Sequence, residues 1–312
     1  MTQPMFTVKH FAESFTKPAE VRTFNAQGPW SSEFEAQILA EGCEEVGVGR
    51  GWTAADSLGL AQLKVVKYVV ANTFPPADIT PLQEMSWLKG LSIGDVKLSG
   101  SFDFSKLKSL EAASVRWQPK KMAGMFEHTG IKRLLIDSYP FNDLSPFAAM
   151  TGLEVLEVRS LRALRSLRGI EGNPRLNTFR VVFGPNLVVH PADQLPPTIE
   201  KVEFYSCKSL TRIDPLGRLP NLKRLQFDKC GHIESLAPLQ ACRELTALYC
   251  YDTISDDGDM GFLAELPKLI DVRMQWRKHF RPSKAEIDAA VLRNRAAAPS
   301  LPEYLQPPQA AK

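Results

Sequence analysis

A six-residue pattern of hydrophobic and polar positions, L-x-x-L-x-L, recurs along this chain. It is clearest where it starts at Ile199, Leu222, Leu245 and Leu269, so that successive starts lie 23, 23 and 24 residues apart. A fixed period of this length is typical of a solenoid, in which each repeat buries its apolar edge against the next. The alternation at the fourth to sixth positions predicts one short β-strand in each repeat.

The same pattern can be projected towards the N-terminus. At every start the first, fourth and sixth residues are apolar, although only 44% of the chain is apolar. Chance alone would give this agreement with a probability on the order of 10⁻¹². The eleven predicted starts are Cys43, Leu63, Leu88, Leu110, Ile131, Leu153, Leu176, Ile199, Leu222, Leu245 and Leu269.

Apolar residues three apart continue upstream of most starts, which predicts a short helical or 3₁₀ turn. Proline often opens this segment, at Pro81, Pro146, Pro215 and Pro238. Proline fits the first helical position, where its missing N–H group is not needed. One repeat is therefore predicted to consist of a strand, a loop and a tight outer turn.

The pattern L-x-x-L-x-L-x-x-C-x-x-I-x-x-L-x-P-L, intact over residues 222–239, resembles the short leucine-rich repeats of the SDS22 and internalin type. The resemblance extends over residues 43–276. It implies an α/β leucine-rich repeat solenoid with a curved parallel sheet on its concave side and short helices or 3₁₀ turns on its convex side. The ninth position is usually Asn in that family, whereas here it is Cys207, Cys230, Thr253 or Leu161. We therefore expect an incomplete ladder of side-chain bonds to the backbone.

The two ends of the chain do not repeat, and each is predicted to form a helical cap. Residues 1–42 form the N-terminal cap, with Ser32 and Glu35 as the capping box of a helix over 32–41. Residues 277–296 form the C-terminal cap, with Ser283 and Glu286 opening a helix over about 283–295. Residues 297–312 are predicted to be a disordered tail because they are rich in proline and alanine.

Composition limits the classes of partner and the location. The net charge is +3, and the 38 basic and 35 acidic residues are interspersed, which argues against a nucleic-acid partner. The first fifteen residues contain no apolar run typical of a secretory signal, and no stretch approaches the ~20 apolar residues of a membrane helix. The sequence therefore predicts a cytoplasmic protein that does not bind a membrane.

No motif for catalysis, a cofactor or a metal is recognisable. The five histidines are isolated, and His128 occupies a repeat position that predicts a structural role. Gly47, Gly49 and Gly51 would suggest a phosphate cradle only if a helix followed directly, and the repeat register predicts strand and loop instead. We therefore predict no catalytic residue, no cofactor and no metal site.

The five cysteines contain no C-x-x-C pair. Cys207 and Cys230 occupy the same position of adjacent repeats, so they should stack on each other. These positions face the core, where cysteine behaves as a small apolar residue, and we favour this structural interpretation. A redox role or a shared metal stays open for this pair.

The remaining candidate is the face of the sheet lined by the third, fifth and seventh residues of each repeat, because side chains alternate along a strand. Tyrosine, tryptophan and arginine, the residues enriched at binding hot spots, occur there with both signs of charge. We expect an aromatic cluster of Tyr205, Tyr249, Tyr251 and Trp276 to bind a protein partner. The predicted partner-binding residues are Arg116, Trp117, Arg133, Asp137, Glu157, Arg159, Arg180, Glu203, Tyr205, Arg224, Asp228, Tyr249, Tyr251, Arg273 and Trp276.

These observations predict a non-enzymatic protein-binding module. By resemblance it would be an intracellular regulator or inhibitor, similar to effector or toxin-immunity proteins; neither its partner nor its oligomeric state follows from the sequence. The alternative is an enzyme or small-molecule binder in the irregular N-terminal region. That alternative requires Glu44, Glu45, Arg50 and Trp52 to converge.

Overall fold

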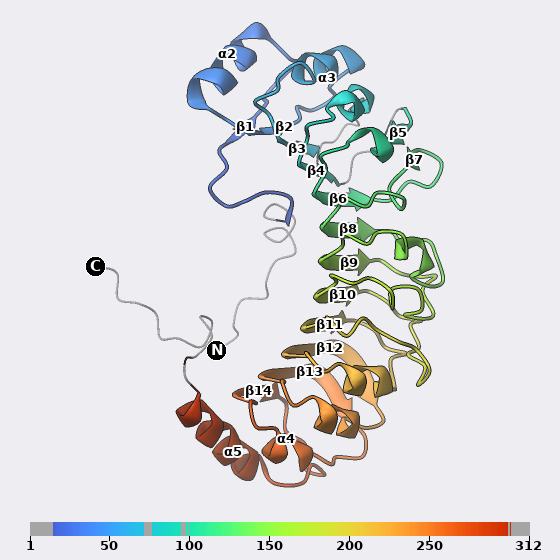
Figure 1. Cartoon of the computed structure of the whole chain (residues 1–312), viewed down its shortest axis with the longest axis vertical. Coiled ribbons are helices and arrows are strands. Elements are labelled where there is room, and N and C mark those ends of the chain that lie inside the picture. Colours follow the sequence, from blue (N-terminus) through green and yellow to red (C-terminus); the bar gives the residue numbers. More distant parts are fainter. Residues whose placement is uncertain (1–14, 72–76, 95–97, 99, 299, 301–312) are drawn as a thin grey trace, which may run out of the picture. The chain divides into compact units, whose positions relative to one another are not determined.

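The computed structural model describes residues 15–71, 77–94, 98, 100–298 and 300 (Figure 1). The chain divides into two compact units. The first unit comprises Met1–Ala163 with Gly172–Leu176, and the second comprises Leu164–Glu171 with Asn177–Lys312. The predicted tail lies outside the described residues except at 297, 298 and 300.

The first unit contains a parallel sheet whose strands follow one another in chain order. A separate two-stranded parallel sheet, β5 (Phe102–Asp103) with β7 (Met122–Ala123), lies in its loops. The strands of the larger sheet are β1 (Thr23–Asn25), β2 (Glu45–Gly47), β3 (Tyr68–Ala71), β4 (Gly90–Ile93), β6 (Ala112–Arg116), β8 (Arg133–Asp137) and β9 (Val155–Arg159).

The second unit repeats this arrangement. Fourth positions pair with fourth positions, as in Val202 with Leu225 and Leu225 with Leu248. The predicted strands and their register are thereby confirmed in this unit. Its strands are β10 (Thr178–Val182), β11 (Lys201–Tyr205), β12 (Arg224–Ile233), β13 (Ala247–Ser255) and β14 (Asp271–Met274).

The apolar positions of the pattern form the core. Leu222, Leu225 and Phe227 have no exposed surface, and the rings of Phe204 and Phe227 stack 5.8 Å apart in adjacent repeats. Burial of one such side chain stabilises the fold by about 1.5–3 kcal/mol. Because a shift of one residue would move this whole set to the other face, the core fixes the register of the sheet.

The predicted proline-opened turns are also confirmed. A proline lies in the first turn of the 3₁₀ helices η1 (Thr80–Glu84), η3 (Ser145–Phe147), η4 (Asp214–Arg218) and η5 (Ala237–Ala241). Among the described residues, four other segments between strands are helical without a proline opening: α2 (Ser32–Glu41), α3 (Ala54–Leu60), η2 (Phe104–Lys106) and α4 (Phe262–Glu265).

The eighth residue of six repeats adopts a left-handed backbone conformation. The φ angles lie between 44° and 62°. Such a conformation costs roughly 1–2 kcal/mol in a residue other than glycine. In four of these repeats it directly follows the last residue of the strand, whereas in the other two it lies within β12 and β13. These residues are Ser138, Ser160, Phe183, Ser206, Lys229 and Asp252.

One predicted repeat start is wrong. Val46 pairs with Val69 rather than with Val66, so the second repeat starts at Val66 and not at Leu63. The neighbouring spacings are then 23 and 22 residues instead of 20 and 25. Apolar residues three apart run through this region, and they allowed the pattern to be placed one step too early. As a result Tyr68, predicted to point into the core, belongs to the opposite face of the strand.

The N-terminal segment is not wholly non-repeating, contrary to the prediction. Strand β1 pairs in parallel with β2 and aligns Phe24 with Val46. Residues 21–26, V-R-T-F-N-A, carry apolar residues at the first, fourth and sixth positions, 22 residues before Cys43. Phe24 and Ala26 are buried, so a further repeat begins at Val21.

Both predicted terminal helices are present. Helix α2 (Ser32–Glu41) is capped by Ser31, whose hydroxyl accepts a bond of 3.3 Å from the N–H of Phe34. The expected capping box between Ser32 and Glu35 is therefore wrong, because the N-cap lies one residue earlier, at Ser31.

The C-terminal helix agrees with its prediction at the N-terminal end. Helix α5 (Lys284–Ala297) has the expected capping box between Ser283 and Glu286. It buries Ile287, with Ala290 and Val291 on the same side, against its own unit.

Candidate protein-binding face of the sheet

The third, fifth and seventh side chains of the second unit form three rows across the strands, which we call the sheet face. The pairing places equivalent residues beside one another, about 4.8 Å apart. Row three contains Thr178, Lys201, Arg224, Ala247 and Asp271; row five contains Arg180, Glu203, Gln226, Tyr249 and Arg273; and row seven contains Val182, Tyr205, Asp228 and Tyr251.

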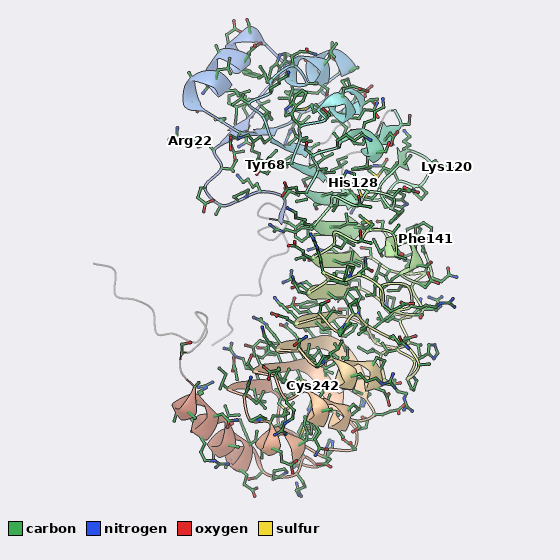
Figure 2. All side chains as sticks on the ribbon, in the orientation of Figure 1. Arg22, Tyr68, Lys120, His128, Phe141 and Cys242 are labelled. Atoms are coloured by element: carbon green, nitrogen blue, oxygen red, sulfur yellow. The ribbon has the colours of Figure 1, made fainter. Side chains whose placement is uncertain are left out.

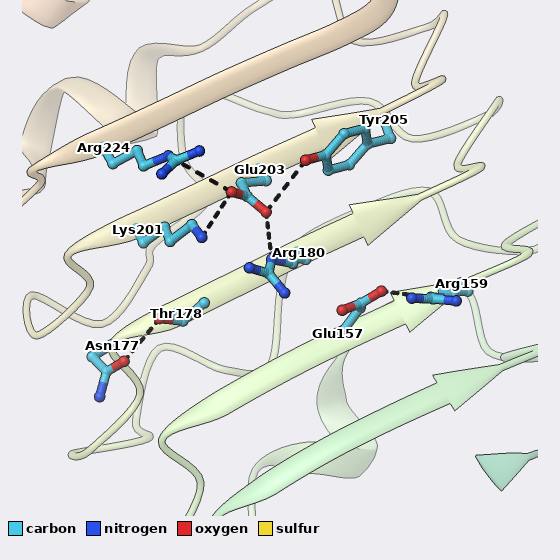
Figure 3. Close-up of polar contacts among 9 residues, drawn as sticks. All are labelled: Glu157, Arg159, Asn177, Thr178, Arg180, Lys201, Glu203, Tyr205 and Arg224. Carbon is cyan, nitrogen blue, oxygen red and sulfur yellow. Dashed lines mark hydrogen bonds and ion pairs between the residues drawn. The ribbon is translucent and has the colours of Figure 1, made fainter. Parts of the chain in front are cut away.

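Glu203 lies at the centre of a cluster of basic side chains (Figure 3). Its carboxylate forms an ion pair with Arg180, lies 2.9 Å from the Lys201 ammonium group and lies 3.9 Å from the Arg224 guanidinium group. The hydroxyl of Tyr205 donates to the same carboxylate over 3.5 Å. Glu203 is buried beneath these groups, which join three adjacent strands.

The surrounding charges keep this buried carboxylate ionised. Burial alone would raise the pKa of Glu203, but Arg180, Lys201 and Arg224 hold the pKa below its ordinary value of 4.5. Burial in turn lowers the pKa of Lys201, although Glu203 opposes that change. The cluster is therefore a network of mutually compensated charges.

A second network surrounds Asp271. The Tyr249 hydroxyl donates to its carboxylate over 2.6 Å, Arg273 lies at 3.1 Å, and Arg295 from α5 lies at 3.7 Å. The guanidinium groups of Arg224 and Arg273 lie 4.9 and 5.2 Å from the Tyr249 ring centroid, within cation–π range. The Tyr249 side chain thereby connects the two networks.

The predicted contact residues differ in accessibility. Arg180, Glu203 and Tyr249 are buried. The expectation that these three contact a partner directly is therefore wrong, because at most 9% of each residue is exposed. Tyr205, Arg224, Asp228, Arg273 and Trp276 are half-buried, and Tyr251 is exposed.

The structure adds Phe183 to the accessible residues beside row seven. Its N–H group donates to the Tyr205 carbonyl over 2.8 Å, and its side chain is 56% exposed. With φ at 59°, it is a bulky residue in a conformation that glycine or asparagine adopts at less cost. The sequence contained a signal for this residue, because Phe183 occupies the eighth position of its repeat, where several other repeats have serine.

The predicted residues of the first unit are mostly engaged within the chain. Arg116 pairs with Asp137 over 2.9 Å, and Arg159 pairs with the buried Glu157. Trp117 packs against Phe126 with ring centroids 4.9 Å apart and is buried. The prediction of Trp117 as a contact residue is therefore wrong, because the indole lies in the core.

The chain's own N-terminal segment covers part of the first unit's sheet. Phe15 and Thr16 are buried, and the Arg133 guanidinium group lies 4.9 Å from the centroid of the Phe15 ring. The Thr16 carbonyl lies so close to Gly90 that a Cβ there would meet it at 2.1 Å. Lys17 forms an ion pair of 2.7 Å with Glu45. The chain itself therefore covers this part of the sheet, and Arg133 is occupied internally.

Three residues of the alternative N-terminal site, Glu44, Glu45 and Trp52, have different partners within the chain. Glu44 pairs with Lys67, whereas the Trp52 indole donates to the Gly28 carbonyl over 2.7 Å. A pocket near β2 is lined by Glu44 but by none of Glu45, Arg50 or Trp52. That pocket therefore does not bring the four residues together.

Cys207, Cys230 and His128 form contacts within the chain. Cys207 and Cys230 are buried, and both the hydrogen bond between the thiols and burial raise the pKa of Cys207. His128, labelled in Figure 2, uses one ring nitrogen with the Leu107 carbonyl at 2.9 Å and accepts from the Gly130 N–H with the other. Within the described ranges, no group of three or more His, Cys, Asp or Glu side chains could hold a metal ion.

The recurring strand, left-handed turn and outer 3₁₀ turn decide the fold. The chain is a leucine-rich repeat solenoid. No family model matches the chain, and no curated protein matches it in sequence. Of the helices in the described part of the chain, none has the length and apolar character needed to cross a membrane.

Several solved leucine-rich repeat structures resemble it at 14–16% identity. An internalin (InlF) of Listeria monocytogenes is 16% identical, with 75% of this chain and 80% of that chain covered and a TM-score of 0.41. The functional domain of InlJ from the same organism, which includes a cysteine ladder, is 14% identical over 75% and 54%, with a TM-score of 0.46. A leucine-rich repeat protein of Leptospira interrogans is 14% identical over 88% of both chains, with a TM-score of 0.42.

Replacing Glu203 tests the first charge network. We expect Glu203→Gln to lower the free energy of unfolding by about 3 kcal/mol at pH 7, because three basic groups lose their buried partner. Since the folded pKa of Glu203 is lowered, its contribution is present above pH 4.5 and is lost as pH falls through the folded pKa. Denaturant unfolding at pH 7 and at about pH 3 should show the difference between variant and parent shrinking in acid.

Glu234→Gln serves as the matched control, because the Glu234 side chain is exposed and lies 3.6 Å from Arg212. Its effect should stay within about 0.5 kcal/mol at both pH values. An equal loss of stability in acid and at neutral pH for Glu203→Gln would contradict the ionised state.

Replacing Phe15 tests the internal coverage of the first unit. Phe15→Ala should detach the N-terminal segment, because the segment loses its buried ring and the contact with Arg133. The protease Lys-N, which cleaves on the N-terminal side of lysine, should then cut the Thr16–Lys17 bond at least about tenfold faster than in the parent, since detachment exposes the backbone. An unchanged rate of cleavage at this bond, with cleavage elsewhere as an internal reference, would show that the ring does not hold the segment.

Proposed function

We propose that this chain is a non-enzymatic protein-binding module whose partner docks on the sheet face of the second unit. Solenoids offer extended surfaces for such contacts. The observation that carries the proposal is Phe183, a large apolar side chain that is both 56% exposed and left-handed in its backbone. Strain of this kind persists where another requirement offsets it, and partner binding is such a requirement.

The proposed contact residues divide into two groups with different roles. Tyr205, Arg224, Asp228, Tyr251 and Arg273 have accessible surface and would contact the partner together with Phe183. The buried Arg180, Glu203 and Tyr249 would hold those side chains in place. Preorganised side chains lose less conformational entropy on binding, so this support increases affinity without contact.

We propose a cytoplasmic regulator or inhibitor, similar to effector or toxin-immunity proteins, as the physiological role. Helices α2 and α5 would cap the ends of the solenoid, because terminal repeats need cover for their cores.

One substitution separates the energetic cost of the left-handed backbone at Phe183 from the contribution of its side chain to binding. Phe183→Asn should raise the free energy of unfolding by about 1 kcal/mol, because asparagine adopts the left-handed conformation at lower cost. The same variant, and Tyr251→Ala, should each weaken capture of a cellular partner by about tenfold, since aromatic anchors contribute much of the binding energy. Affinity capture with quantitative mass spectrometry, alongside denaturant unfolding, measures both effects.

Leu292→Ala is the matched control, because Leu292 is a comparably exposed apolar residue on α5 that lies outside the sheet face. It should leave the captured protein unchanged. Equal recovery of the same partner by the parent, Phe183→Asn and Tyr251→Ala would refute docking on this face.

A further inference from the structure

Charges on the sheet face of the second unit are sorted by depth. The carboxylates of Glu203 and Asp271 each retain only 4% of their side-chain exposure. Most of the basic side chains that surround them are far more accessible: Lys201 retains 26%, Arg224 31%, Arg273 39% and Arg295 37%, whereas Arg180 retains 10%. A partner approaching these residues therefore meets cations first.

The net charge of these residues is positive as well. The face and the adjoining Arg295 comprise five basic and three acidic side chains, a formal excess of two positive charges. The remaining acid, Asp228, is half-buried in row seven. Acidic and basic residues are interspersed in the sequence, but the surface that they form is basic. The acidic side chains are shorter and lie beneath their basic partners.

The basic and aromatic side chains occupy different parts of the face. The accessible cations come from rows three and five, whereas Tyr205 and Tyr251 come from row seven. Phe183 adjoins row seven through its bond to Tyr205. An incoming segment would therefore meet positive charge towards one end of the strands and apolar surface towards the other.

We propose that the partner presents an acidic protein segment to this face, with its carboxylates on Lys201, Arg224 and Arg273 and an apolar side chain beside Phe183 and Tyr251. This inference rests on the proposed function and specifies the chemistry of the partner. The small charge excess and the aromatic row favour a protein segment over nucleic acid, which would require a longer continuous stripe of cations.

The buried carboxylates make this arrangement effective. Glu203 and Asp271 fix the positions of the basic groups, so fewer side chains must be ordered when the partner binds. The same carboxylates already compensate part of the positive charge. Each new contact should therefore be weak and sensitive to salt, and several must act together.

Defined peptides test the charge requirement with the full chain. One fluorescein-labelled peptide carries glutamates interrupted by two phenylalanines, and its counterpart carries lysines in place of the glutamates. We expect the acidic peptide to bind and to lose about tenfold in affinity between ~50 and ~500 mM NaCl. The basic peptide should bind at least about tenfold more weakly than the acidic one at low salt.

Substitutions locate the binding. Arg224→Gln combined with Arg273→Gln should lower affinity for the acidic peptide by about tenfold. Lys208→Gln combined with Arg243→Gln removes the same charge away from the sheet face and should change affinity by no more than about twofold. If the first pair lowers the melting temperature strongly, Lys201→Gln provides a second test, because Arg180 and Arg224 still accompany Glu203.

The outcomes separate this inference from the proposed function. If Phe183→Asn and Tyr251→Ala weaken partner capture while salt and the Arg224/Arg273 pair do not, docking stands and the acidic partner is refuted. If none of these changes affects capture, both are refuted. Equal binding of the acidic and basic peptides, or tighter binding of a DNA duplex than of the acidic peptide, would overturn the inference alone.

Discussion

Burial of one apolar edge per repeat is the constraint on which the rest of this structure depends. Leu222, Leu225 and Phe227 are fully buried, and their equivalents pair in register along the neighbouring strands. Once this edge is fixed, alternation along the strand dictates which side chains occupy the opposite face. The charged and aromatic rows are therefore a consequence of core packing, although their chemistry is independent of it.

Periodicity made most of the fold predictable, and its two failures have different causes. Apolar residues spaced three apart serve both the outer turn and the strand, so Leu63 and Val66 fit the pattern equally well in the sequence. Only hydrogen bonding between β2 and β3 distinguishes them. The strand containing Phe24 was missed because its repeat lies in a segment that also carries the signals of a terminal cap.

The site was less predictable, because alternation gives the direction of a side chain but not its depth. Glu203 and Tyr249 point to the expected face, yet both are buried by residues from neighbouring repeats. A short carboxylate beside long basic side chains ends beneath them, since only the longer chains reach solvent. Coverage by Phe15 likewise depends on a contact with Arg133, more than a hundred residues away in the sequence.

The size of the face residues explains why the two units present different surfaces. In the first unit, Gly90 leaves room for the backbone at Thr16, and Ser92 and Ser114 are small and buried as well. Small side chains allow a segment to approach the strands themselves. In the second unit, rows of Arg, Glu and Tyr fill the equivalent space, so a main chain cannot approach so closely. A partner there must bind through the ends of side chains, which makes charge and aromatic surface the determinants of recognition.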